Sequence, residues 1–118
     1  MLSVQIERVD GLAIVACKGR IVRSEAAFTL RNAVASQRSA RVILIDLSEV
    51  SAIEGGGLGM MAVLQRWACD RHIALKLFNP IESVSDRLEQ ANCISGFDII
   101  STDEMLSLLA DVHSPCPL

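Results

Sequence analysis

The stretch that decides the fold spans residues 41–59 and reads RVILIDLSEVSAIEGGGLG. Its first part, residues 41–47, is a nearly continuous apolar run with the length of one strand. Such a run is typical of a central strand that is covered on both faces of its sheet. After a short loop, Glu54 and a cluster of four glycines open a helix that we expect to reach about Arg71.

Upstream of this stretch the sequence predicts a hairpin and a helix. Residues 3–9 alternate apolar and polar side chains, which is the period of a half-buried strand. Asp10 and Gly11 then give a strong turn signal, because both residue types tolerate positive φ. Residues 12–17 form the expected return strand, and Ser24 has the side chain of an N-cap for the helix that follows.

Downstream, the chain alternates between strands and helices. We expect a strand over residues 73–78, a helix over 79–91, a short strand over 97–100 and a final helix over 101–112. Asn79 followed by Pro80 is a compact helix start, with Asn as the cap and Pro in the first helical position. The sequence Ser-Thr-Asp-Glu at 101–104 has the pattern of a capping box.

The expected fold class is therefore α/β, in the order β-β-α-β-α-β-α-β-α, with a single mixed β-sheet covered by helices. The opening hairpin is antiparallel, whereas later strands separated by helices pair in parallel through right-handed crossovers. The length of 118 residues suits one domain, which we place at 1–112. Residues 113–118 hold two of the three prolines and are expected to form a flexible C-terminal tail.

The bulk composition excludes several classes of function. The chain has 11 basic and 14 acidic side chains without a basic block, so we expect no nucleic-acid surface. No apolar run approaches the roughly 20 residues that span a bilayer, and no export signal opens the chain. The four cysteines are far apart and lack metal-ligand spacing. These features indicate a cytoplasmic protein with reduced, mostly buried thiols, no metal site and no direct membrane insertion.

The glycine cluster is the main candidate for a functional site. Each Gly inside a helix costs roughly 1 kcal/mol relative to Ala, and four of the five residues from 55 to 59 are Gly. A tight turn packed closely on the sheet explains one or two of them. The others favour close approach of a partner or ligand to the backbone. The following helix is apolar on nearly all sides, so it either packs among its neighbours or offers part of its surface to another molecule.

Residues 42–59 resemble the central motif of STAS domains, the anti-sigma-factor antagonist family. In that family a hydrophobic strand leads to Asp-Ser-Ser-Gly-Leu-Gly at a helix start, where this chain has residues 54–59, Glu-Gly-Gly-Gly-Leu-Gly. The segment 17–22, Cys-Lys-Gly-Arg-Ile-Val, resembles the family's Gly-Glu-Leu-Asp segment, with Val22 in place of the Asp. The resemblance covers nearly the whole chain and matches the expected order of elements.

The resemblance implies a regulatory, signalling role in which the domain binds a bacterial protein partner. In such antagonists a kinase that is itself the anti-sigma factor phosphorylates the first Ser of the motif. That position is Gly55 here, which has no hydroxyl group. The resemblance therefore implies a constitutive binder, or one whose partner does not use phosphorylation. The implied partner is an anti-sigma factor, a histidine-kinase-like ATPase or another regulatory protein.

Two other hypotheses compete with this one. A STAS subunit of a lipid or anion transport assembly, binding a cytoplasmic ATPase, also fits the missing Ser. A nucleotide-binding enzyme fits poorly, because residues 55–59 match neither a P-loop nor a dinucleotide fingerprint, and Glu54 would repel phosphate. His72 and His113 share no motif with a nucleophile. We therefore expect no enzyme activity and no cofactor.

The expected partner-binding residues come from the resemblance and from the rule that sites in open α/β sheets lie at the carboxyl ends of parallel strands. The sequence is also compatible with a homodimer. The residues assigned to the partner surface are Arg20, Val22, Arg23, Glu54, Gly55, Gly56, Gly57, Leu58, Met61 and Asn79.

Overall fold

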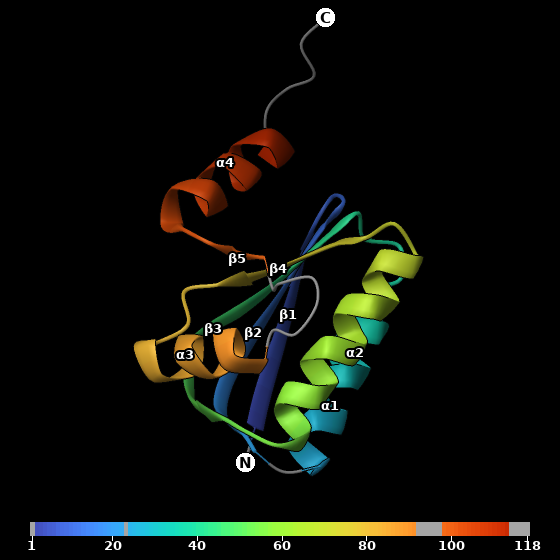
Figure 1. The fold of residues 1–118 in the computed structure, drawn as a ribbon. Coiled ribbons are helices and arrows are strands. Elements are labelled where there is room, and N and C mark those ends of the chain that lie inside the picture. The colour runs from blue at the N-terminus through green and yellow to red at the C-terminus, as the bar shows by residue number, and fades with distance from the viewer. Residues whose placement is uncertain (1, 23, 92–97, 114–118) are drawn as a thin grey trace, which may run out of the picture.

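The computed structural model describes residues 2–22, 24–91 and 98–113 of the chain (Figure 1). These residues form five strands and four helices in the order that the sequence predicts. The elements are β1 (Leu2–Val9), β2 (Leu12–Ile21), α1 (Ser24–Ala35), β3 (Val42–Ile53), α2 (Gly56–Asp70), β4 (Ala74–Phe78), α3 (Glu82–Ala91), β5 (Ile99–Ile100) and α4 (Thr102–His113).

The strands form one mixed sheet in the order β1-β2-β3-β4-β5. Strands β1 and β2 are antiparallel, and every later pair is parallel, so the expected α/β class and topology are confirmed. The hairpin closes on the pair Val9 and Leu12. Asp10 takes the positive φ of the turn, at 52°.

Strand β3 is much longer than the predicted run of residues 41–47, because it continues to Ile53. The sequence placed residues 48–53 in a loop, and this is wrong. Val50 and Ile53 are almost fully buried, whereas Glu49 and Ser51, on either side of Val50, are exposed. Side chains in this half of β3 point alternately into the core and into solvent. The polar residues among them led to the wrong prediction of a loop.

Helices cover the two faces of the sheet unequally. Buried side chains of α1, α2 and α3 join one large core on the first face, which takes Val15 and Cys17 from β2 and Ile43 and Ile45 from β3. The second core is small and contains Leu12, Leu44 and Ile100, with α4 packed on it. In Figure 1, α1 and α2 lie side by side and α4 lies apart from the other helices.

Helix boundaries differ from the predicted ones by one to three residues. Helix α3 begins at Glu82, and Asn79 lies before it in a left-handed conformation with φ 52°, so Asn79 is not its cap. Helix α4 begins as expected, because the N–H of Glu104 donates to the Ser101 hydroxyl at 3.2 Å. It continues through His113, where we expected the tail to begin. Tail residues 114–118 and the predicted strand start at Phe97 lie outside the described residues.

The two described cysteines occupy different environments. Cys17 is buried in the core, and burial together with the nearby charge of Asp46 raises its thiol pKa to about 12. Cys69 is exposed on α2, so of the two described cysteines one is buried and one is not. Cys93 and Cys116 lie outside the described residues. Within the described ranges, no helix is long and apolar enough to cross a membrane.

Candidate protein-binding site

The glycine cluster lies where the parallel strands β2 and β3 end together and α2 begins. The register pairs Ile21 with Ile53, and the N–H of Glu54 then donates to the carbonyl of Ile21 at 3.2 Å. Glu54 and Gly55 connect β3 directly to α2. The short connection places the first turn of α2 at the carboxyl edge of the sheet, as the sequence predicts.

Gly55 is the N-cap of α2 and has a conformation that other residues rarely adopt. Its φ is 53° and its ψ is −117°, and no side chain caps the helix. An L residue with a Cβ is strained at this φ, so the backbone itself favours Gly here. Where the STAS family carries Ser, this chain therefore has Gly55, which has no hydroxyl group. The backbone conformation at this position also favours Gly.

Gly57 has a different role, because it is buried inside the fold. A Cβ at this position would collide with the carbonyl oxygen of Ile21 and would lie 2.8 Å from the Cγ2 of the same residue. Its missing side chain lets α2 pack directly on the end of β2. Gly57 was assigned to the partner surface, and this assignment is corrected. The group that approaches Gly57 closely is Ile21 of the same chain.

Gly56 and Gly59 are exposed, and neither is required by the fold. A Cβ on either residue would meet nothing within 4 Å. Neither has a positive φ. Two glycines in a helix reduce the stability of the fold, and neither packing nor backbone conformation within the chain offsets this loss.

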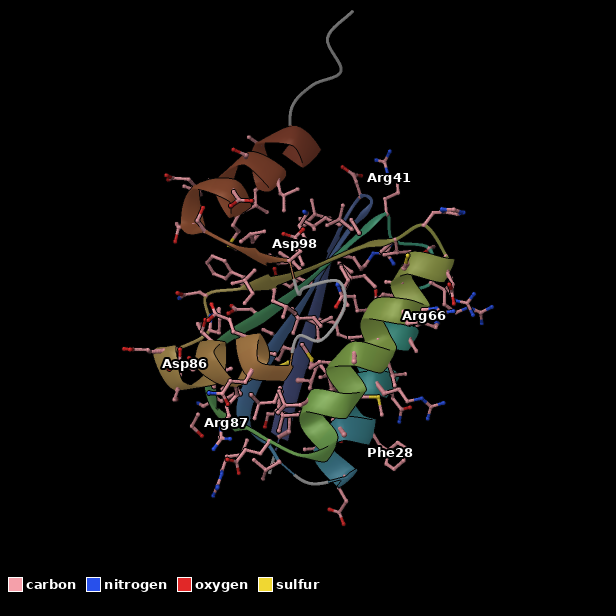
Figure 2. All side chains as sticks on the ribbon, viewed as in Figure 1. Phe28, Arg41, Arg66, Asp86, Arg87 and Asp98 are labelled. Carbon is pink, nitrogen blue, oxygen red and sulfur yellow. The ribbon has the colours of Figure 1, made fainter. Side chains whose placement is uncertain are left out.

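The exposed side of α2 continues this smooth surface. Gly56, Gly59 and Val63 follow one another at helical spacing, with Ala62 beside them, and Val63 is 57% exposed. We call Gly55, Gly56, Gly59, Ala62 and Val63 the α2 surface. Farther along the helix the exposed face becomes charged, where Arg66 pairs with Asp70 at 3.4 Å (Figure 2).

Two apolar residues assigned to the site point inward. Met61 is only 1% exposed and belongs to the large core. Leu58 is half-buried and packs against the same core. Met61 is therefore corrected from a partner contact to a core residue. The adjacent exposed positions, Ala62 and Val63, were overlooked because an all-apolar helix gives no sign of which side faces the sheet.

Glu54 is held by an ion pair that the sequence did not reveal. The Nη2 atom of Arg87 in α3 lies 2.8 Å from Oε1 of Glu54, and both side chains are about half exposed. Figure 2 shows Arg87 at the side of α3 that faces the end of β3. The pair connects residues far apart in sequence, and no local pattern could have indicated it.

Asn79 is separated from the other assigned residues. Strand β4 ends opposite Asp46, because Phe78 pairs with that residue. Strand β3 continues for seven more residues to Ile53, which corresponds to roughly 20 Å at the usual rise of a strand. The prediction treated all carboxyl ends as one edge, but the extension of β3 moves the glycine cluster away from Asn79.

The remaining assigned residues follow β2. Arg20 is exposed near the end of the strand, next to a shift in register between Gly19 and Arg20. Val22 is half-buried just after the strand, and Arg23 lies outside the described residues. Arg20 therefore lies at the same end of the sheet as the α2 surface, but its side chain alternates with that of Ile21 and faces away from α2.

The described parts of the chain contain no metal-binding arrangement. No cluster of three His, Cys, Asp or Glu side chains occurs there that could hold a metal ion. A shallow hollow of about 210 Å³ lies elsewhere, between α4 and the sheet, and is lined by Lys76, Ile100, Glu104, Ser107 and Leu108. Lys76 is paired with Asp98 at 2.6 Å.

The chain has the SpoIIAA-like fold that is seen in solved structures of anti-sigma factor antagonists. The fold expected from the sequence is thereby confirmed. A scan against protein-family models finds no match. A search of curated proteins also finds no significant match.

Three solved structures illustrate the likeness. The anti-sigma factor antagonist SpoIIAA in its unphosphorylated form has a TM-score of 0.74 at 14% identity, over 92% of this chain and 97% of the other. An anti-sigma factor antagonist from Mycobacterium paratuberculosis has a TM-score of 0.77 at 18% identity, over 94% and 96%. A Ser-to-Glu variant of RsbS from Moorella thermoacetica has a TM-score of 0.71 at 16% identity, over 92% and 97%.

Proposed function

We propose that this chain is a non-catalytic regulatory module that binds a protein partner through the α2 surface. The observation that carries the proposal is the open space around Gly56 and Gly59, which the fold itself does not require to be Gly. Together with Ala62 and Val63 they offer a smooth, weakly polar helix face, against which another backbone or a helix can pack closely.

The surroundings of the α2 surface favour a partner with mixed charge. Glu54 presents a carboxylate beside the surface, although Arg87 neutralises part of its charge. Arg20 offers a cation at the same end of the sheet, on the opposite face. Acidic and basic groups at the rim of an interface contribute mainly to orientation and to the rate of association. A partner that resembles an anti-sigma factor or a histidine-kinase-like ATPase is the candidate that the fold favours.

The proposed binding is constitutive. A phosphate on a hydroxyl at the start of α2 would add a charge of about −1.5 to −2 and would alter any interface there. Gly55 cannot accept one, and neither can Gly56 or Gly57. The α2 surface thus stays in one chemical state, and binding is set by the concentration of the partner.

The test is affinity purification from the native cytoplasm with wild type, Gly56→Arg and a control, Ser107→Arg. Gly56→Arg places a long side chain on the α2 surface, whereas Ser107 is an exposed residue of α4. We expect an anti-sigma factor or kinase-like ATPase to be recovered with wild type and with the control but lost with Gly56→Arg. Recovery of a membrane-associated ATPase instead would indicate a transport assembly. Equal recovery with all three proteins would refute binding through the α2 surface.

A further inference from the structure

Strand β1 forms one edge of the sheet and is unusually open. It pairs with β2 without interruption, from Leu2 opposite Gly19 to Val9 opposite Leu12. Proteins commonly protect such an edge with Pro, Lys, a bulge, a short strand or a covering loop. Residues 2–9 contain no Pro, Gly or Lys, and their charged side chains are Glu7 and Arg8. Within the described ranges, no loop or turn makes a backbone hydrogen bond to this strand.

The hairpin determines which backbone groups of β1 face outward. A two-residue turn makes Val9 and Leu12 a hydrogen-bonded pair, and such pairs alternate along an antiparallel ladder. Glu7, Gln5 and Ser3 therefore bond to β2. The N–H and C=O groups of Leu2, Val4, Ile6 and Arg8 point away from the sheet, toward the open edge.

The side chains next to these outward groups suit a protein contact. Val4 packs at the margin of the large core, and Ile6 is 40% exposed. Arg8 is turned toward the end of α1, where its Nη1 donates to Gln37 at 3.3 Å and to Ser39 at 3.2 Å. On the opposite face of β1, Ser3, Gln5 and Glu7 are exposed.

We propose that two copies of this chain pair through β1 in an antiparallel manner, so that their sheets join into one. The two-fold axis passes between the two Gln5 residues. Val4 of each copy then lies opposite Ile6 of the other, and Ser3 lies opposite Glu7. This interface is separate from the α2 surface and does not depend on the proposed function.

The side-chain pattern selects this register. Residues directly opposite each other share a face of the joined sheet, so the axis must pass through equivalent residues. An axis at Glu7 would place two carboxylates together, and one at Arg8 would place two guanidinium groups together. An axis at Ile6 would place Val4 opposite Arg8. The axis at Gln5 brings no like charges together and pairs every residue from Leu2 to Arg8, with Leu2 opposite Arg8 only at the two ends. An axis at Val4 would pair only residues 2–6 of the described strand.

Symmetric disulfide formation tests the register directly. The pair at Gln5 is not hydrogen-bonded, so its Cα atoms should be about 4.5 Å apart, within the range of a disulfide. The background carries Cys69→Ser, Cys93→Ser and Cys116→Ser and keeps the buried Cys17. We expect Gln5→Cys to form a covalent dimer under mild oxidation. Ser3→Cys, also exposed on the same face, should remain monomeric. Equal cross-linking of both variants, or none at Gln5→Cys, overturns the proposal.

Sedimentation velocity of the unmodified chain provides the second measurement. We expect a concentration-dependent dimer, and we expect Val4→Pro to raise its dissociation constant by about tenfold or more, because Pro removes an outward N–H. The same substitution leaves the ladder with β2 intact, so far-UV circular dichroism should be unchanged. Wild type that stays monomeric at high concentration, or a folded Val4→Pro variant that dimerises equally well, would contradict the pairing.

Discussion

At the scale of single residues, neighbouring glycines in the same cluster serve different purposes. Gly55 supplies a positive φ, Gly57 makes room for Ile21, and Gly56 and Gly59 serve no purpose within the fold. The sequence predicted that packing explains only one or two of the four. It could not assign the roles, because each depends on where the end of β2 lies.

Alanine substitutions should separate these roles. Gly57→Ala is expected to cost about 1–3 kcal/mol, because its Cβ meets the backbone of Ile21. Gly55→Ala should cost about 1–3 kcal/mol, because its φ of 53° with its ψ of −117° is a backbone conformation that residues with a Cβ rarely adopt. Gly56→Ala should be neutral or stabilising by up to about 1 kcal/mol. Urea denaturation measures all three. A loss for Gly56→Ala as large as that for Gly57→Ala would show that Gly56 is a packing residue.

Cys17 makes the free energy of unfolding depend on pH in the alkaline range. Its pKa in the folded state is about 12, raised from 9.0 first by burial and then by Asp46. The raised value favours the neutral thiol in the fold. This contribution is fully present below pH 9 and is lost as the pH rises toward 12, at about 1.4 kcal/mol per pH unit.

The free energies of unfolding of wild type and Cys17→Ala should be compared between pH 8 and pH 11. The stability of wild type should fall more steeply above pH 9, so the difference between the two proteins should shrink as pH rises. Chemical denaturation at each pH measures this difference. A difference that is constant across the range would show that Cys17 does not ionise differently in the folded and unfolded states.

At the scale of elements, the order of strands and helices was predictable and the length of β3 was not. Apolar runs, the Asp10 turn and the Ser101 cap each follow from local chemistry. The second half of β3 depends on the partner strand β2 and on the helices above it, which a local pattern does not contain. Because β3 is longer than expected, Asn79 was wrongly grouped with the site, and the contact between α3 and Glu54 was missed.

The ion pair between Glu54 and Arg87 is expected to contribute modestly. Both groups are about half exposed, so solvent screens their attraction. Arg87→Gln should cost at most about 1 kcal/mol at low salt, and less in 1 M NaCl. Arg66→Gln is the control, because its pair with Asp70 is longer and more exposed. A cost above about 2 kcal/mol, unchanged by salt, would mean that Arg87 supports the loop in another way.

At the scale of the whole molecule, the two faces of the sheet are covered unequally. Helices α1, α2 and α3 complete a continuous core on the first face. On the second face, the α4 side chains within residues 102–110 that pack on the core of three buried residues are half-buried: Met105, Leu108 and Leu109. The α2 surface and the β1 edge thus both belong to the part of the molecule with the larger core, whereas α4 is an addition to the other face.

This asymmetry predicts that α4 opens before the rest of the molecule unfolds. Regions with few buried apolar contacts exchange their amide hydrogens through local opening, at a lower free energy than global unfolding. Native-state hydrogen exchange should therefore show weaker protection in α4 than in β2 and β3. Leu108→Ala should weaken protection in α4 further and leave that of Ile45, buried on the first face, nearly unchanged. If Ile45 loses protection in parallel with α4, the two cores unfold as one unit, and α4 is an integral part of the domain.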